Sequence, residues 1–217
     1  MSEYIMKKSF YILLLVFISC YNDNSEIIES SNAANKSSEL STMIKSMSSH
    51  KASFDDHIDK SSCFSIVFPY QLKINSVTTT INSIEDISDL SLDDDIEIVY
   101  PVTAVFFDYT QHEMTSLIEH NSMIAFCEND FDVEPNSCMN FQYPITLKTF
   151  NEINGNFETS HLNSDKELFL FLDNLHDTDV YEIEYPIILH DSDLNSHRIN
   201  SNLEFEGVVN SRPVDCE

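Results

Sequence analysis

The chain has 217 residues and a strongly acidic composition, with 37 Asp and Glu against 11 Lys and Arg. Its formal net charge of −26 at pH 7 leaves too few basic side chains to neutralise phosphates, which excludes nucleic-acid binding. The same charge repels anionic lipid head groups, so attachment to a membrane must come from a hydrophobic anchor and not from a basic surface.

The N-terminal residues have the pattern of a secretory signal peptide. Two lysines precede an apolar run, Phe10 to Ser19, that is too short to span a bilayer comfortably as a helix. The run ends at Cys20, where the sequence resembles bacterial lipoprotein precursors, whose signal peptidase cuts before a lipidated cysteine. The resemblance implies a lipoprotein signal peptide at residues 1–19 and lipid attachment at Cys20. Phe17 departs from it, because leucine is usual there. An ordinary cleaved signal with an incidental cysteine is the alternative.

Residues 20–62 hold the lipidated cysteine and a serine-rich stretch, which has 12 serines after Cys20 and no Gly or Pro. This composition predicts a largely disordered tether to the membrane. Four apolar side chains at helical spacing allow a short helix within it, but such a helix needs a docking partner to persist. They are Leu40, Met43, Ile44 and Met47.

From Cys63 onward, four segments alternate apolar and polar residues around an aromatic–proline pair. They are FSIVFPYQL, IEIVYPVTA, MNFQYPITL and YEIEYPIIL, with the prolines Pro69, Pro101, Pro144 and Pro186. A period of two predicts a strand with one face in a core and the other in water. Because proline cannot donate to a strand ladder, each one is expected at an edge, a bulge or a strand entrance.

Each segment leads into a polar turn and a second short strand, and that strand ends in a serine followed three residues later by Asp or Glu. The four pairs are Ser83/Asp86, Ser116/Glu119, Ser164/Glu167 and Ser201/Glu204. Such a pair predicts a capping box, in which serine and carboxylate satisfy free N–H groups at a helix start. Four copies at corresponding positions predict a repeated strand–turn–strand–helix unit.

The units occur in consecutive pairs, and a cysteine stands at each end of a pair. We therefore predict an α+β fold that is mainly β, made of two tandem ββαββα modules of antiparallel strands with short helices. Module 1 spans residues 63–127 and module 2 spans residues 138–217, joined by an acidic linker at 128–137.

Cysteine usage fits an oxidising compartment. With Cys20 assigned to lipid, four cysteines remain for two disulfides, which three connectivities can satisfy. The four are Cys63, Cys127, Cys138 and Cys216. We expect the pairs 63–127 and 138–216, one in each module, because a disulfide offsets a thin core. A bond between 127 and 138 across the linker is the alternative.

These features together are similar to a family of uncharacterised outer-membrane-type lipoproteins of Gram-negative bacteria. The likeness rests on the anchoring cysteine, the serine-rich tether and the cysteine-bounded pairs of Phe/Tyr-Pro strands with Ile/Leu-Asn-Ser helix starts, and it covers residues 63–216. It implies a place in the outer membrane, on the surface or the periplasmic face, and no known activity. The chain departs from the pattern at Met114 and Thr115 and in the scarcity of glycine in its turns.

No catalytic constellation stands out in the sequence. A hydrolase serine needs a strained turn flanked by glycine, but neither of the two glycines flanks a serine, and the recurring serines are explained as helix caps. The eight histidines are scattered without an HExxH pattern, which disfavours a zinc hydrolase. His112 and His120 are expected in solvent, whereas His190 and His197 flank a predicted turn and could converge.

Calcium binding by turn carboxylates is a further candidate. The stretch DSDLNS places Asp191, Asp193 and Asn195 at alternate positions, as at the start of an EF-hand. The required glycine and the final glutamate are replaced by Ser196 and Asn202, so the EF-hand interpretation fails. A looser calcium site in a hairpin turn remains.

The sequence therefore predicts a lipid-anchored protein of the cell envelope that is not an enzyme, needs no cofactor and contacts an unknown protein or extracellular ligand. The alternative is a calcium-dependent binding protein that uses turn carboxylates.

Overall fold

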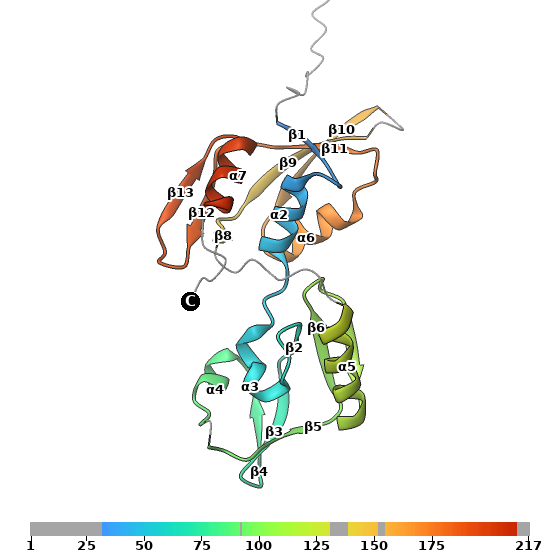
Figure 1. The fold of residues 1–217 in the computed structure, drawn as a ribbon, viewed down its shortest axis with the longest axis vertical. Coiled ribbons are helices and arrows are strands. Elements are labelled where there is room, and N and C mark those ends of the chain that lie inside the picture. The colour runs from blue at the N-terminus through green and yellow to red at the C-terminus, as the bar shows by residue number, and fades with distance from the viewer. Residues whose placement is uncertain (1–31, 92, 131–138, 152–154, 212–217) are drawn as a thin grey trace, which may run out of the picture.

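The chain folds into two lobes that lie one beyond the other along the long axis of the molecule (Figure 1). The computed structural model describes residues 32–91, 93–130, 139–151 and 155–211. Lobe 1 consists of residues 50–130. Lobe 2 consists of residues 139–211 together with the N-terminal residues 32–49.

Lobe 1 contains two three-stranded antiparallel sheets, with strand orders β2-β6-β7 and β4-β3-β5. The strands are β2 (Phe64–Ile66), β3 (Tyr70–Ile74), β4 (Val77–Ile81), β5 (Ile96–Val99), β6 (Val102–Phe106) and β7 (Gln111–Met114). The helices are the 3-10 helix η1 (Ser53–Asp55), α3 (Asp56–Asp59), α4 (Ile84–Ser88) and α5 (Leu117–Asp130).

Lobe 2 repeats this topology, with strand orders β13-β12-β8 and β1-β11-β9-β10. The strands are β1 (Ala33–Asn35), β8 (Met139–Phe141), β9 (Ile145–Asn151), β10 (Asn156–Leu162), β11 (Val180–Ile183), β12 (Ile187–Asp191) and β13 (Ser196–Ile199). The helices are α2 (Glu39–Ser48), α6 (Asp165–Asn174) and α7 (Asn202–Asn210). The predicted α+β, mainly β fold is confirmed.

The four aromatic–proline pairs mark the points where the chain leaves one sheet and enters the other. The peptide bonds before Pro69, Pro101, Pro144 and Pro186 are all cis. For example, β2 pairs with β6, whereas β3, directly after Pro69, pairs with β4 and β5. Each proline thus lies at a strand entrance, one of the three expected positions. Each segment that was predicted as one long strand is divided between two sheets. The alternation of buried and exposed side chains nevertheless continues across the proline, as the buried Ile66 and Tyr70 on either side of Pro69 show.

The two units of a lobe interlock through their first strands. In lobe 1, β2 of the first unit pairs with β6 of the second, and β5 of the second pairs with β3 of the first. In lobe 2, β8 pairs with β12, and β11 pairs with β9, in the same way. A single unit would leave these edges without partners, so the smallest part that satisfies its own strand ladders is the pair of units.

The N-terminal segment departs most from the sequence prediction. We expected a largely disordered tether up to residue 62, and this is wrong for residues 32–62. Helix α2 places Leu40, Ile44 and Met47 in the core of lobe 2, and β1 extends its larger sheet by pairing with β11. The docking partner that the apolar spacing requires is therefore lobe 2 itself.

The same segment then crosses to lobe 1, where η1 and α3 pack against β2, β5 and α4. The lobes meet around Tyr109, whose hydroxyl donates to the carbonyl of Ser48 at 2.9 Å. Its ring meets that of Phe169 edge-on, with centroids 5.6 Å apart. Lys51 of lobe 1 also donates to the side chain of Asn140 in lobe 2.

One predicted disulfide is present. Cys63 and Cys127 are bonded, with Cα atoms 6.1 Å apart, so the start of β2 is tied to α5. Cys20, Cys138 and Cys216 lie outside the described residues, so lipid attachment and the second disulfide stay predictions.

The capping boxes form, with one change in their geometry. Serine Oγ accepts the expected N–H at three of the four helix starts, those at Ser116, Ser164 and Ser201, but not at Ser83. The carboxylates reach back one residue further than a capping box requires. Glu167 accepts from the N–H of Asn163 at 2.7 Å, and the other three accept in the same register.

Candidate functional site

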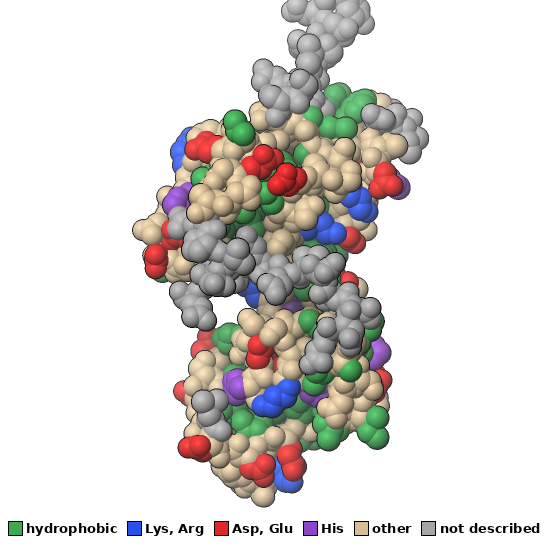
Figure 2. Space-filling model, viewed as in Figure 1, with side chains coloured by type: hydrophobic (Ala, Val, Ile, Leu, Met, Phe, Trp, Pro, Cys, Tyr) green, Lys and Arg blue, Asp and Glu red, His purple; other side chains and the backbone are tan. Residues whose placement is uncertain are grey.

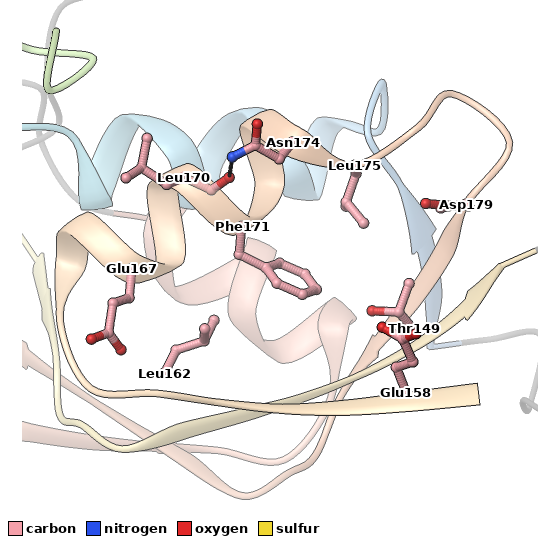
Figure 3. Close-up of a pocket in the computed structure, with 9 residues that line it drawn as sticks. All are labelled: Thr149, Glu158, Leu162, Glu167, Leu170, Phe171, Asn174, Leu175 and Asp179. Carbon is pink, nitrogen blue, oxygen red and sulfur yellow. Dashed lines mark hydrogen bonds between the residues drawn. The ribbon is translucent and has the colours of Figure 1, made fainter. Parts of the chain in front are cut away.

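A pocket of about 460 Å³ opens between helix α6 and the β9–β10 hairpin of lobe 2 (Figure 3). Part of its lining is apolar, from Leu162, Leu170, Phe171 and Leu175. The rest is polar, from Thr149, Glu158, Glu167, Asn174 and Asp179. An apolar wall beside convergent polar groups is a feature that ligand-binding sites share.

Helical and strand geometry explain why these side chains share one cavity. On α6 the lining residues follow the spacing of a single helix face, which places them side by side. They are Glu167, Leu170, Phe171 and Asn174. The other face of the helix carries Leu168 and Leu172 into the core. Across the pocket, Thr149 of β9 and Glu158 of β10 are directly opposite partners in the strand ladder.

The polar groups are unevenly distributed around the pocket. Thr149, Glu158 and Asp179 lie at one end, Glu167 and Leu162 lie at the other, and Phe171 projects between them (Figure 3). The Oγ1 atom of Thr149 is buried and has no hydrogen-bond partner among the described atoms. Because a buried hydroxyl usually has a partner, this end of the pocket lacks a group that a water molecule or a ligand can supply.

Carboxylates dominate the electrostatics of the pocket. Asp179 is only 5% exposed, and its oxygens accept from Asn151 Nδ2 at 2.9 Å and from the N–H of His176 at 3.2 Å. Glu158 is exposed. None of the described lining residues is basic. Figure 2 shows the wider setting, with acidic side chains on both lobes and basic ones in fewer places.

A second group of polar atoms is enclosed in lobe 1. Asp55 and Asp59 are 0% exposed; one oxygen of each accepts a backbone N–H, from Ile66 at 2.9 Å and from Ser61 at 3.0 Å. The other oxygen of each, and the hydroxyl of Tyr70, have no partner among the described atoms. The arrangement is closed to solvent, which suits a proton-holding cluster better than a catalytic site.

Burial controls the charge of this cluster. It raises the pKa of Asp55 to about 7. Burial, together with the nearby Asp55 charge, raises the pKa of Asp59 to about 9. Burial also raises the pKa of Tyr70, and the negative charges of Asp55 and Asp59 raise it further. Asp59 is therefore protonated at neutral pH in the folded protein.

His120 lies beside this cluster and not in solvent, so the expectation for it is wrong. Its Nε2 donates to the carbonyl of Asp59 at 2.8 Å, and its Nδ1 accepts from the hydroxyl of Tyr100 at 2.6 Å. Burial lowers the pKa of His120, which favours the neutral ring that this pairing requires. His112 is exposed as expected and lies 3.4 Å from Glu119.

The residues predicted for calcium form a turn. Asp191 is buried, and its Oδ1 accepts the N–H groups of Asp193 at 3.1 Å and Asn195 at 2.8 Å. Its Oδ2 faces His197 Nε2 at 3.0 Å. Aspartate commonly organises turns in this way. Within the described ranges, no group of three or more His, Cys, Asp or Glu could hold a metal ion. Calcium binding stays an untested alternative.

The two histidines that could converge face different side chains in the described contacts. His190 lies 3.1 Å from Gln142 Oε1 and 3.2 Å from Ser196 Oγ, whereas His197 faces Asp191.

Sequence reasoning missed the pocket and the buried acids for different reasons. The run LFLF in α6 is apolar on both helix faces, and this signal could have indicated an apolar surface beyond the core. Asp55 and Asp59 stand in a polar stretch and carry no local sign of burial.

No protein-family model, no curated protein and no solved structure matches this chain. In the part of the chain that the structure describes, no helix combines the length and the hydropathy needed to cross a membrane.

Proposed function

We propose that this chain is a lipid-anchored protein of the bacterial cell envelope that binds another protein or an extracellular ligand and is not an enzyme. The anchor is Cys20, directly after the apolar run of the signal peptide. Because the chain is acidic, charge cannot hold it at an anionic membrane surface. Under this proposal the lipid on Cys20 is therefore its means of attachment.

The observation that carries the binding role is the pocket beneath α6. It offers an apolar wall, a hydroxyl that has no partner in the described part of the chain, and carboxylates, which together can orient a ligand. None of its described lining residues is a serine, cysteine, histidine or lysine. The serine–histidine and cysteine–histidine pairs of acyl-transfer enzymes are thus missing from the described lining.

The fold limits how far the protein stands from its anchor. The described chain begins at Asn32, 12 residues after Cys20. A fully extended chain of that length spans at most roughly 40 Å. Strand β1 lies at the end of lobe 2 that faces away from lobe 1 (Figure 1). Under this proposal, lobe 2 stays near the membrane and lobe 1 is the more distant part.

Protease treatment of cells that make the full chain tests the location. Digestion is compared in intact cells, in cells with a permeabilised outer membrane and in fully lysed cells, with an antibody against the lobes as readout. Loss of the signal in intact cells indicates surface exposure and an extracellular ligand. Loss only after outer-membrane permeabilisation indicates a periplasmic partner. Loss only after complete lysis would place the protein in the cytoplasm and contradict the proposal.

A further inference from the structure

We infer that the pocket beneath α6 receives an arginine side chain of a partner polypeptide that lies along the outer edge of β10. The inference rests on the proposed binding function and names the chemistry of the ligand. It draws on the charge of the pocket, its shape and the strand beside it.

The charge of the pocket calls for a cation. Glu158, Glu167 and Asp179 line it, and none of its described lining residues is basic. The opposite side of the same helix is different. There Lys45 forms an ion pair with Asp173 at 2.7 Å, and Lys36 donates to the carbonyl of Asp173 at 2.6 Å. The lobe thus supplies lysines to α6 away from the pocket, whereas the charged side chains that line the pocket are all carboxylates.

The shape of the pocket suits a cation carried on an apolar stem. Leu170, Phe171 and Leu175 form a wall on which the methylene groups of an arginine can pack. At one end, Thr149, Glu158 and Asp179 gather around the position that the guanidinium would take (Figure 3). The exposed carboxylate of Glu158 can bind the planar guanidinium through paired hydrogen bonds, which a lysine ammonium cannot reproduce, whereas the oxygens of Asp179 already accept from Asn151 and His176.

Two further features of this end favour arginine. Thr149 Oγ1 has no hydrogen-bond partner among the described atoms and is enclosed, so a turn of its side chain toward the cavity would let it accept a hydrogen bond from one of the five N–H groups of the guanidinium. Phe171 projects into the cavity, and a guanidinium stacks on an aromatic ring better than an ammonium does.

The neighbouring strand indicates that the arginine belongs to a polypeptide. Strand β10 is the last strand in the order β1-β11-β9-β10, so its outer edge has no strand partner in the described fold. An extended peptide can add to such an edge through main-chain hydrogen bonds while alternate side chains enter pockets. Glu158, a pocket residue, belongs to this edge strand.

Binding of matched peptides tests the inference. The protein is the mature chain carrying Cys20→Ser, and the probe is the blocked peptide acetyl-Thr-Val-Arg-Val-Thr-amide. Two controls replace the arginine with citrulline, which keeps the shape without the charge, and with norleucine, which keeps only the apolar stem. Amide NMR shifts report both the affinity and the residues affected.

We expect the arginine peptide to shift the amides of Thr149, Glu158, Phe171 and Asp179, with a Kd on the order of 1 mM. The citrulline and norleucine peptides should bind at least about fivefold more weakly. Glu158→Gln should weaken the arginine peptide by roughly two- to fivefold, and more salt should weaken it further. Glu113→Gln, which removes an exposed carboxylate from β7 of lobe 1, should leave the affinity unchanged.

Thr149→Val adds a variant that keeps the shape of the side chain and removes only its hydroxyl. It should reduce the preference for arginine over norleucine, and an unchanged amide spectrum elsewhere shows that the fold is intact. Equal affinity for all three peptides would overturn the cation preference. Shifts centred outside the pocket, or no shift at about 10 mM peptide, would overturn the inference itself. Neither result affects the proposal of an envelope protein, which the protease experiment tests separately.

Discussion

The hydroxyl of Tyr181 lies 2.8 Å from the Oγ of Ser41, a buried hydrogen bond between residues 140 positions apart in the sequence. It joins strand β11 to helix α2 and ties the N-terminal segment into the core of lobe 2. This segment is therefore a structural part of lobe 2.

Removing apolar contacts of α2 should destabilise lobe 2. Ile44 is 1% exposed in its core, so Ile44→Ala should lower the free energy of unfolding by about 2–5 kcal/mol. Thr42→Ala, at an exposed position of the same helix, should change it by about 0.5 kcal/mol or less. Urea denaturation measures both. Equal effects of the two substitutions would show that α2 is not part of the folded core.

The buried acids of lobe 1 predict that stability falls as pH rises. The pKa of Asp55 is raised from 3.8 to about 7, and that of Asp59 from 3.8 to about 9. Above pH 4 the unfolded chain releases these protons while the folded protein keeps them. The folded state therefore binds more protons, and its stability decreases between about pH 4 and pH 9. The contribution of the two protonated aspartates to folding stability is complete only below pH 4.

Asp59→Asn tests this sign, because it removes the ionisable group and keeps a similar shape. The melting temperature of the wild-type protein should fall from pH 5 to pH 9 by more than that of Asp59→Asn. The matched control is Asp89→Asn, an exposed carboxylate after α4, which should retain the wild-type pH dependence. Parallel pH profiles for wild type and Asp59→Asn would contradict the assignment of a proton to this cluster.

The disulfide of lobe 1 should contribute substantially to its stability. Cys63 and Cys127 are 64 residues apart, and a loop of that length corresponds to roughly 4 kcal/mol of unfolded-state restriction. Cys63→Ser with Cys127→Ser should therefore lower the denaturation midpoint of lobe 1. Mass mapping of the non-reduced protein checks the connectivity. A linked peptide that joins Cys127 to Cys138 would contradict it, and one that joins Cys138 to Cys216 would support the predicted second disulfide.

Calcium should have little effect on stability. The Asp191 oxygens already face N–H groups of the turn and the His197 ring, so coordination would cost these contacts. We expect no shift of the melting temperature when millimolar calcium is added. A clear rise that Asp193→Asn abolishes would instead favour the calcium-dependent alternative.

The sequence was informative where its signals repeat and weak where partners are distant. Four proline segments and four capping boxes predicted the two modules, because turn and cap chemistry is local. The docking of Leu40 and Ile44 was beyond such reasoning, since helical spacing shows an apolar face and not what covers it. Composition likewise placed Asp55 and Asp59 in a disordered tether, although their burial depends on β2 and β3, which follow them in the chain.

The candidate site shows the same limit. The cap at Ser164 predicted where α6 begins, and hence which residues share a helix face. The cavity also needs Thr149 and Glu158 from the hairpin and Asp179 from the loop before β11, and only the folded sheet brings these together.

Mass analysis of the mature N-terminus tests the central claim most directly. The full chain and its Cys20→Ser variant are expressed in a Gram-negative host and purified from membrane and soluble fractions. The account predicts that the wild-type protein is in the membrane fraction, begins at Cys20 and carries acyl mass on that residue, while the variant loses both the acyl mass and the membrane association. An unmodified Cys20, or an uncleaved chain in the cytoplasm, would contradict it.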